Sequence, residues 1–171
     1  MSTAEVRDAI EKIAKVLSEH PQKGRSRSPP ATAALETGLW FRIVGPNGEA
    51  AVSDMPPPLG GEGSAPAPGW LLRASLASCH ATVIAMRAAQ LGITLTTLEV
   101  AVTSESDVRG LLGIDERVSA GLVGLRTHVE IGAAGASPEQ LRQIVSWAEA
   151  HSPIGCTVRD PQTTAVEVEV V

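Results

Sequence analysis

The two cysteines of this chain, Cys79 and Cys156, are the residues whose chemistry is most informative. A thiolate is a strong nucleophile and is easily oxidised, so a pair of thiols indicates redox chemistry or a disulfide. Cys79 lies in an apolar stretch, where a free cysteine commonly fills core space and is inert. Reactivity would require a nearby cation or a favourable helix end, and access for a substrate. At this point the sequence allows both interpretations of Cys79, as an inert core residue and as a reactive thiol.

Other chemically capable residues form weaker patterns. Cys79 and His80, with His151 and Cys156, are zinc-ligand types, but neighbours on one helix point about 100° apart and rarely converge. We therefore expect no metal site and no cofactor, and we expect His80 to be a helix-packing or interface residue rather than a general base. The sequence has no P-loop, no dinucleotide fingerprint and no nucleophile elbow.

Composition excludes several classes of partner. The formal net charge is −5 and aromatic residues make up 2% of the chain, which disfavours nucleic acid. No run approaches the roughly 20 apolar residues that span a bilayer, so we expect no membrane partner. Residues 1–17 contain recurring Glu and Lys, unlike the apolar region of a signal peptide. We therefore expect a cytoplasmic protein, where two cysteines are more often reactive or buried than a permanent disulfide.

A long apolar helix is predicted to position Cys79. Residues 70–91 contain neither Pro nor Gly, and Gly92 follows as a natural C-terminal cap. A helix that is apolar on most sides is expected to be buried on most sides. It follows a Pro- and Gly-rich loop, residues 54–69, and loops of this length tend to be functional or to cover something.

The remaining pattern divides the chain into a helix at 1–20, a linker at 21–34 and a domain at 35–171. Ser137-Pro138 and Ser152-Pro153 each combine a cap with a first-turn proline and predict two further helices, the second carrying Cys156. The fold class expected is α+β with antiparallel sheets around a long central helix. Strand-like alternation occurs at 39–44, 49–53, 97–104, 122–131 and 164–171.

At the central helix the sequence LLRASLASCHATVIAMRAAQLGI resembles the OsmC/Ohr superfamily, as do the S-P-I-G turn at 152–155 and the closing strand. The resemblance covers residues 35–171 and implies an OsmC-like fold in an intertwined homodimer. It also implies oxidative-stress defence, in which Cys79 reduces organic hydroperoxides and a dithiol reductant restores the enzyme. Arg42 is the candidate partner of the Cys79 thiolate, and the alternative is a solvent-facing strand residue.

Two departures from the family pattern affect these expectations. Gly69 stands where the family motif has a glutamate, and Ser152 occupies the position of the resolving cysteine. Cys156 lies one helical turn later, which displaces it by about 5.4 Å from the position of the resolving cysteine. A disulfide tolerates only Cα separations of about 4.4–6.8 Å, so Cys156 could not take over the pairing without local rearrangement. Cys156 is therefore a displaced candidate for the resolving thiol. The competing hypothesis is a catalytically degenerate protein that binds a small hydrophobic ligand at the dimer interface.

Overall fold

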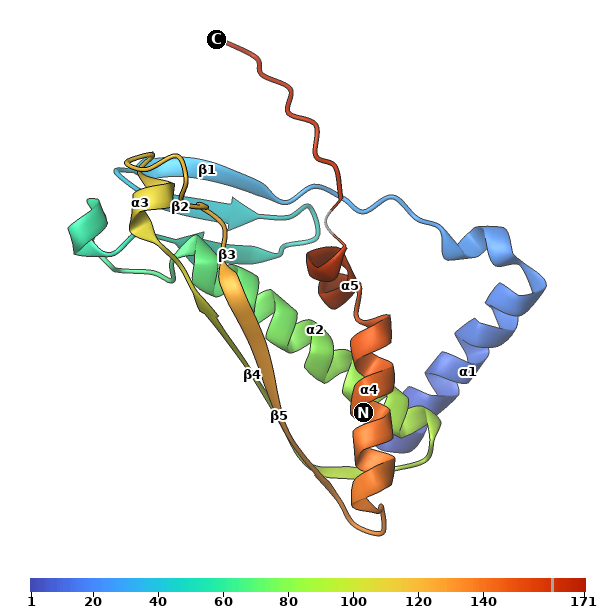
Figure 1. Ribbon diagram of the computed structural model, residues 1–171. Coiled ribbons are helices and arrows are strands. Elements are labelled where there is room, and N and C mark those ends of the chain that lie inside the picture. The colour runs from blue at the N-terminus through green and yellow to red at the C-terminus, as the bar shows by residue number, and fades with distance from the viewer. Residues whose placement is uncertain (161) are drawn as a thin grey trace. The chain divides into compact units, whose positions relative to one another are not determined.

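A computed structural model, which describes residues 1–160 and 162–171, confirms an α+β fold with antiparallel sheets (Figure 1). The chain forms two compact units. One comprises Met1–Arg7, Leu76–Ala101 and His128–Val171, and the other Asp8–Ser75 and Val102–Thr127. The α-helices and strands in chain order are α1 (Thr3–Glu19), β1 (Thr32–Thr37), β2 (Trp40–Val44), β3 (Ala50–Ser53), α2 (Pro68–Gln90), β4 (Leu95–Glu105), α3 (Val108–Leu111), β5 (Val123–Ala133), α4 (Pro138–His151) and α5 (Pro153–Arg159). Short 3-10 helices lie at Pro21–Gly24 and Pro57–Leu59.

The strands expected at 39–44 and 49–53 are present as the hairpin of β2 and β3, within a three-stranded antiparallel sheet of order β1-β2-β3. The intervening turn has Gly48 at φ +90°, a conformation that glycine adopts without strain. Glu49 fixes this turn, because its carboxylate accepts hydrogen bonds from the backbone and the side-chain amide of Asn47. Strand β1 was not anticipated by the alternation pattern, and all of its residues are exposed.

A single carboxylate organises the loop that leads to α2. Asp54 is 2% exposed, and its side chain accepts hydrogen bonds from the backbone N–H groups of Met55, Glu62 and Ser64 and from the Ser64 hydroxyl. These bonds hold the pKa of Asp54 below its ordinary value of 3.8, the N–H of Ser64 having the largest effect and burial opposing it. A Cβ at Gly61 would collide with the carbonyl oxygen of Met55. The Pro- and Gly-rich stretch is therefore a closed loop.

Helix α2 begins two residues before the expected start and ends one residue before the expected end. Gly92 has φ +71°, and the N–H groups of Gly92 and Ile93 bond back to the carbonyls of Ala89 and Ala88, which satisfies the helix end. The expectation of burial on most sides is wrong for the single chain. The buried residues of α2 are Leu76, His80, Ile84, Ala88 and Ala89.

The apolar residues of α2 that stay exposed explain this correction. Trp70, Leu72 and Met86 are 40–50% exposed, and Leu91, directly after the helix, is 51% exposed. The periodic signal identified an apolar surface correctly, but the elements of one chain cover only the stripe through Leu76 and Ile84. Much of the apolar surface of α2 is therefore not buried within one chain.

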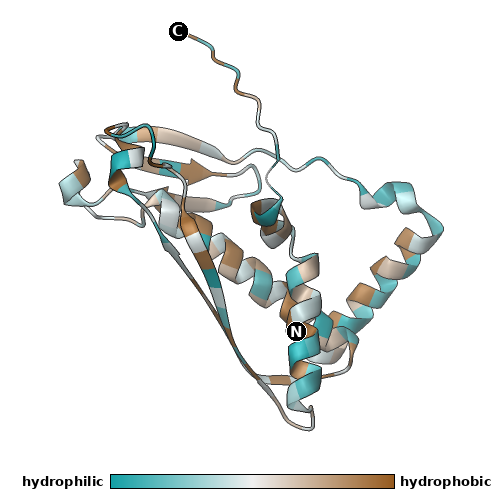
Figure 2. Ribbon diagram, in the orientation of Figure 1, coloured by the Kyte–Doolittle hydropathy of each residue, from teal (hydrophilic) through white to brown (hydrophobic). Residues whose placement is uncertain are grey.

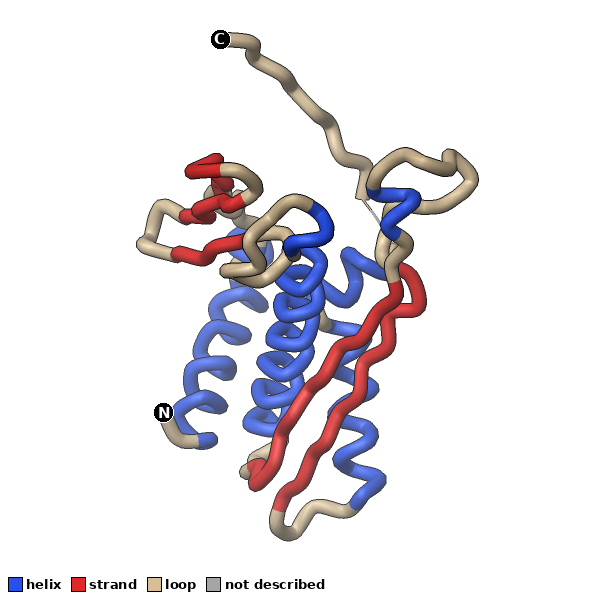
Figure 3. The backbone as a smooth tube through the Cα atoms, turned by 90° about the vertical axis from the view of Figure 1, so that its left-hand side faces the viewer, coloured by secondary structure: helices blue, strands red, loops and turns tan. Residues whose placement is uncertain are grey.

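The core of the first unit lies between α2 and α4. Ile84 and Ala88 pack with Ile144 and Ala148, each 1% exposed. Apolar side chains from the paired strands β4 and β5, which run side by side in Figure 3, complete the cluster. The partly buried residues around the cluster are Val83, Ile93, Leu95, Leu98, Val100, Val129, Ile131, Leu141 and Val145.

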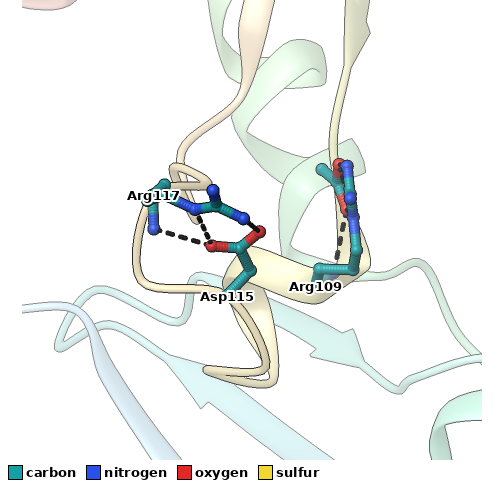
Figure 4. A network of polar contacts seen from close by, with 4 residues as sticks. Arg109, Asp115 and Arg117 are labelled. Atoms are coloured by element: carbon teal, nitrogen blue, oxygen red, sulfur yellow. Dashed lines mark hydrogen bonds and ion pairs between the residues drawn. The ribbon is translucent and has the colours of Figure 1, made fainter.

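Two arginine–aspartate pairs brace the connection between β4 and β5 (Figure 4). Arg109 binds Asp107 through both guanidinium and backbone, and this holds the pKa of Asp107 at about 2. Arg117 binds Asp115 in the same manner, with Nη2 at 2.9 Å from the carboxylate. Both arginines are thus committed to neighbouring carboxylates.

The closing strand expected at 164–171 is contradicted. The described C-terminal residues, 162–171, have no regular secondary structure. Val166, Val168 and Val170 are 80–90% exposed and alternate with glutamates, a pattern visible along the tail in Figure 2. A strand exists only where a partner supplies its hydrogen bonds, and this tail pairs with no strand in the described chain. No helix among the described residues is long and apolar enough to cross a membrane.

Asp54→Asn is expected to lower the midpoint of thermal unfolding at pH 7 by roughly 3–6 °C, because one amide oxygen cannot accept all four hydrogen bonds. The lowered pKa means that the carboxylate stabilises the folded state above pH 4, and that this contribution is lost as pH falls below the ordinary value of 3.8. The stability of the variant should therefore fall less steeply than that of the wild type as the pH is lowered below about 4. Asp160→Asn, at an exposed aspartate, is the matched control; equal effects of the two substitutions would contradict the role of Asp54.

Candidate functional site

Cys79 lies in the middle of α2, and its sulfur contacts a buried hydroxyl. The hydroxyl of Ser152 donates a hydrogen bond to Cys79 Sγ at 3.2 Å. Cys79 is half-buried, whereas Ser152 is 0% exposed. A half-buried thiol can still be reached by a small molecule, and a fixed donor at its sulfur stabilises a thiolate that forms there.

Local sequence explains why Ser152 occupies this place. Ser152 is at once the C-cap of α4 and the N-cap of α5, and its hydroxyl accepts a hydrogen bond from the N–H of Gly155 at 3.1 Å. Pro153 fits the first turn of α5 because it lacks an N–H. At the other end of α4, Ser137 is the cap that the sequence predicts, and it forms a capping box with Gln140. The Ser152 hydroxyl thus accepts a hydrogen bond from the Gly155 N–H and donates one to the Cys79 sulfur.

His80 presents a buried nitrogen to the same turn of α5. Its side chain is 9% exposed, and Nε2 has no hydrogen-bond partner among the described residues. A Cβ on Gly155 would lie 2.6 Å from this nitrogen and 3.1 Å from Ser152 Oγ, so the ring depends on a glycine there. Burial lowers the pKa of His80, the charge of Glu149 opposes this, and Arg159 adds to it. The imidazole is therefore held towards its neutral form.

The sulfur of Cys156 has other neighbours. Cys156 Sγ lies 3.4 Å from the carbonyl oxygen of Ala150, and Arg159 Nη2 lies 3.5 Å from the sulfur. Arg159 also binds Glu149, at its carbonyl oxygen and at its carboxylate. Both cysteines are free thiols in this structure. The structure thus brings Ser152, not Cys156, into contact with Cys79.

Arg42 lies on β2 with 57% of its side chain exposed, and its Nε is 2.6 Å from the carboxylate of Glu36. Its role towards Cys79 stays a prediction. At Gly69, a Cβ would lie 3.9 Å from Arg73 Nη1, a guanidinium that donates to the Ser104 hydroxyl. A glutamate at position 69 would therefore lie beside the basic side chain of Arg73. In this chain Arg73 is hydrogen-bonded to Ser104 instead.

The remaining histidine considered for a metal has a structural role. The ring of His151 stacks on Trp147 with centroids 3.9 Å apart, and its Nδ1 lies 2.7 Å from the Trp147 carbonyl oxygen. Arg87 lies over the other ring, 4.6 Å from the centroid of Trp147. In the part of the chain that the structure describes, no three His, Cys, Asp or Glu side chains gather as metal ligands do.

Comparison with known proteins gives a consistent assignment. The family model described as OsmC-like protein matches residues 61–167, and no curated protein matches the chain. An OsmC-like protein of Mycoplasma pneumoniae is similar in structure, with a TM-score of 0.66, 18% identity, and coverage of 80% of this chain and 91% of that one. An organic hydroperoxide resistance protein from Legionella pneumophila has a TM-score of 0.58 and 20% identity, with 79% and 91% covered. Another, from Elizabethkingia anophelis, has a TM-score of 0.59 and 17% identity, with 80% and 91% covered.

Gly155→Ala is expected to destabilise the fold by about 1–3 kcal/mol through overpacking, although alanine normally stabilises a helix interior. The cause is the 2.6 Å approach of the new Cβ to His80 Nε2. Chemical denaturation measures the effect. Gly24→Ala is the control, because its Cβ meets only Leu17 Cδ2 at 3.7 Å. The effect should be clearly smaller in a His80→Ala background, and an unchanged effect there would rule out the contact with His80 as the main cause.

Proposed function

Because the chain belongs to the OsmC-like family, we propose that it is a thiol-dependent peroxidase that reduces organic hydroperoxides with Cys79 as its nucleophile. The observation that supports this best is the half-buried Cys79 sulfur with a hydroxyl donor from fully buried Ser152. The organic hydroperoxide resistance proteins of similar fold support the same activity. Oxidative-stress defence is the role that follows from it.

In the proposed reaction the Cys79 thiolate attacks the terminal oxygen of the hydroperoxide. The O–O bond breaks, the alkoxide takes up a proton and leaves as an alcohol, and the sulfur becomes a sulfenic acid. The Ser152 hydroxyl, which already donates to Sγ at 3.2 Å, holds the thiolate in one orientation before the attack. Thiol reductant then restores the cysteine. We propose the cytoplasm as the place of action, because two free cysteines suit a reducing compartment.

The active unit we propose is a homodimer. The described chain has six buried hydrophobic residues, few for 171 residues of which 43% are hydrophobic. Ser75, Thr82 and Met86 recur on one exposed side of α2 with Leu72, and Cys79 borders this face. A second copy that covers this face would bury apolar surface and enclose a site for a small hydrophobic substrate.

A binding protein without peroxidase activity is the second candidate. It is favoured by Gly69, which supplies no carboxylate, and by the ion pair that engages Arg42. An open apolar groove of about 520 Å³, lined by residues of β5 and α4 such as Ile131 and Leu141, offers space for a hydrophobic ligand. Reaction with hydroperoxide separates the two candidates, because a binding protein loses no thiol.

Cys79→Ser is expected to reduce the consumption of tert-butyl hydroperoxide with dithiothreitol by about 100-fold or more, because a serine hydroxyl is not a nucleophile of comparable strength. A peroxide assay measures the rate, and circular dichroism checks that the variant is folded. Free thiols of the wild-type protein should fall on titration with the hydroperoxide. Unchanged consumption by the variant, or no loss of thiol in the wild type, would leave the binding protein as the better candidate.

Met86→Glu is expected to convert the dimer to a monomer, because a charge would be desolvated in the proposed interface on α2. Light scattering after size exclusion gives the mass of the species. Leu112→Glu, at a 57% exposed residue beyond α3, is the matched control and should stay dimeric. A wild-type mass of 17.7 kDa at high protein concentration would contradict the homodimer.

A further inference from the structure

Ser152 occupies the place from which a second thiol would have to act. Its Oγ contacts Cys79 Sγ at 3.2 Å, and none of its side chain is exposed. Serine and cysteine differ by one atom, so a sulfur at this position would stand next to the Cys79 sulfur. The chain instead places there a hydroxyl, which is not oxidised by a sulfenic acid and forms no disulfide.

Cys156 is held away from that place by its own contacts. Its N–H donates to the Ser152 carbonyl at 2.8 Å, which fixes it one helical turn further along α5. Its thiol forms hydrogen bonds with the Ala150 carbonyl oxygen and with the guanidinium of Arg159. Disulfide formation with Cys79 requires an S–S distance of about 2.05 Å and a narrow range of Cα separations. Cys156 would therefore have to leave these partners before it could pair with Cys79.

His80 adds a second polar atom beside Ser152. Its Nε2 is buried without a partner among the described residues, and it faces the same Gly155 position as Ser152 Oγ. A buried polar atom that lacks a hydrogen bond is unfavourable. Oxidation of Cys79 to a sulfenic acid adds a hydroxyl group near this turn, and that group both donates and accepts hydrogen bonds. A disulfide to a sulfur at position 152 would add no such group.

From these contacts we infer that the protein is a one-cysteine peroxidase whose oxidised Cys79 is reduced by an external monothiol. The inference rests on the proposed peroxidase function and names its second substrate. A monothiol sulfur attacks the Cys79 sulfenic acid, an S–S bond forms, and the hydroxyl leaves with a proton as water. A second monothiol attacks the mixed disulfide, which returns the Cys79 thiol and releases the oxidised disulfide of the monothiol. Cys156 takes no part.

Three variants test this with tert-butyl hydroperoxide as oxidant and 2-mercaptoethanol or dithiothreitol as reductant. After one equivalent of oxidant, the wild type should gain one oxygen atom by intact mass and lose one thiol. Cys156→Ser should do the same and turn over at the wild-type rate with either reductant. Ser152→Cys should instead lose two hydrogen atoms and two thiols, and its turnover with 2-mercaptoethanol should fall by about 10-fold or more, because a monothiol reopens an internal disulfide inefficiently.

Ser152→Ala is the matched control for Ser152→Cys, since it disturbs the same helix cap without adding a sulfur, and it should form no internal disulfide. An internal disulfide in the wild type that Cys156→Ser abolishes would overturn the inference and leave the peroxidase intact. The absence of a new disulfide in folded Ser152→Cys would overturn it as well. If Cys79 resists oxidation in every protein tested, the peroxidase function itself fails, and the inference falls with it.

Discussion

The hydrogen bond between the Ser152 hydroxyl and the Cys79 sulfur is the contact on which the rest of the site depends. It joins the middle of α2 to the junction of α4 and α5, where Ser152 also caps α5. A buried donor that loses its acceptor costs about 1–3 kcal/mol, so movement of α2 away from this junction would be unfavourable. The cluster of Ile84 with Ile144 fixes the same pair of helices by packing. One contact thus both fixes the position of the Cys79 sulfur and supplies its hydrogen-bond donor.

The elements that could be predicted from sequence are those with local signals. Ser137 and Ser152 announce helix starts by a cap followed by proline, and both helices begin there. Gly92 announces the end of α2 in the same way. The importance of Asp54 could not be predicted, because one carboxylate in a Pro- and Gly-rich stretch gives no sign of which N–H groups will turn towards it. Only the folded loop reveals that four donors converge there.

Sequence patterns were less informative about what covers an apolar face. Periodicity shows that the surface of α2 is apolar, but it does not say whether the same chain or another covers it. The alternation at 164–171 has the same ambiguity: Val166 and Val168 satisfy the pattern of a half-buried strand, yet no strand of the described chain pairs with them. Both expectations were wrong for one chain, and both concern surface that association would bury. The error therefore has a physical content, since it marks the faces left without a partner.

The hydrogen bond recorded at the Cys79 sulfur comes from a neutral group. Ser152 is a neutral donor, and burial holds His80 towards its neutral form. The guanidinium considered for the site, that of Arg42, is paired with Glu36. A neutral donor acts only at contact distance, whereas an ionic partner also acts over several ångströms and suffers screening by salt. The contact that the proposed peroxidase would use therefore depends on the geometry of one turn, which Gly155 permits by leaving room for the His80 ring and Pro153 favours by starting α5 directly after the serine.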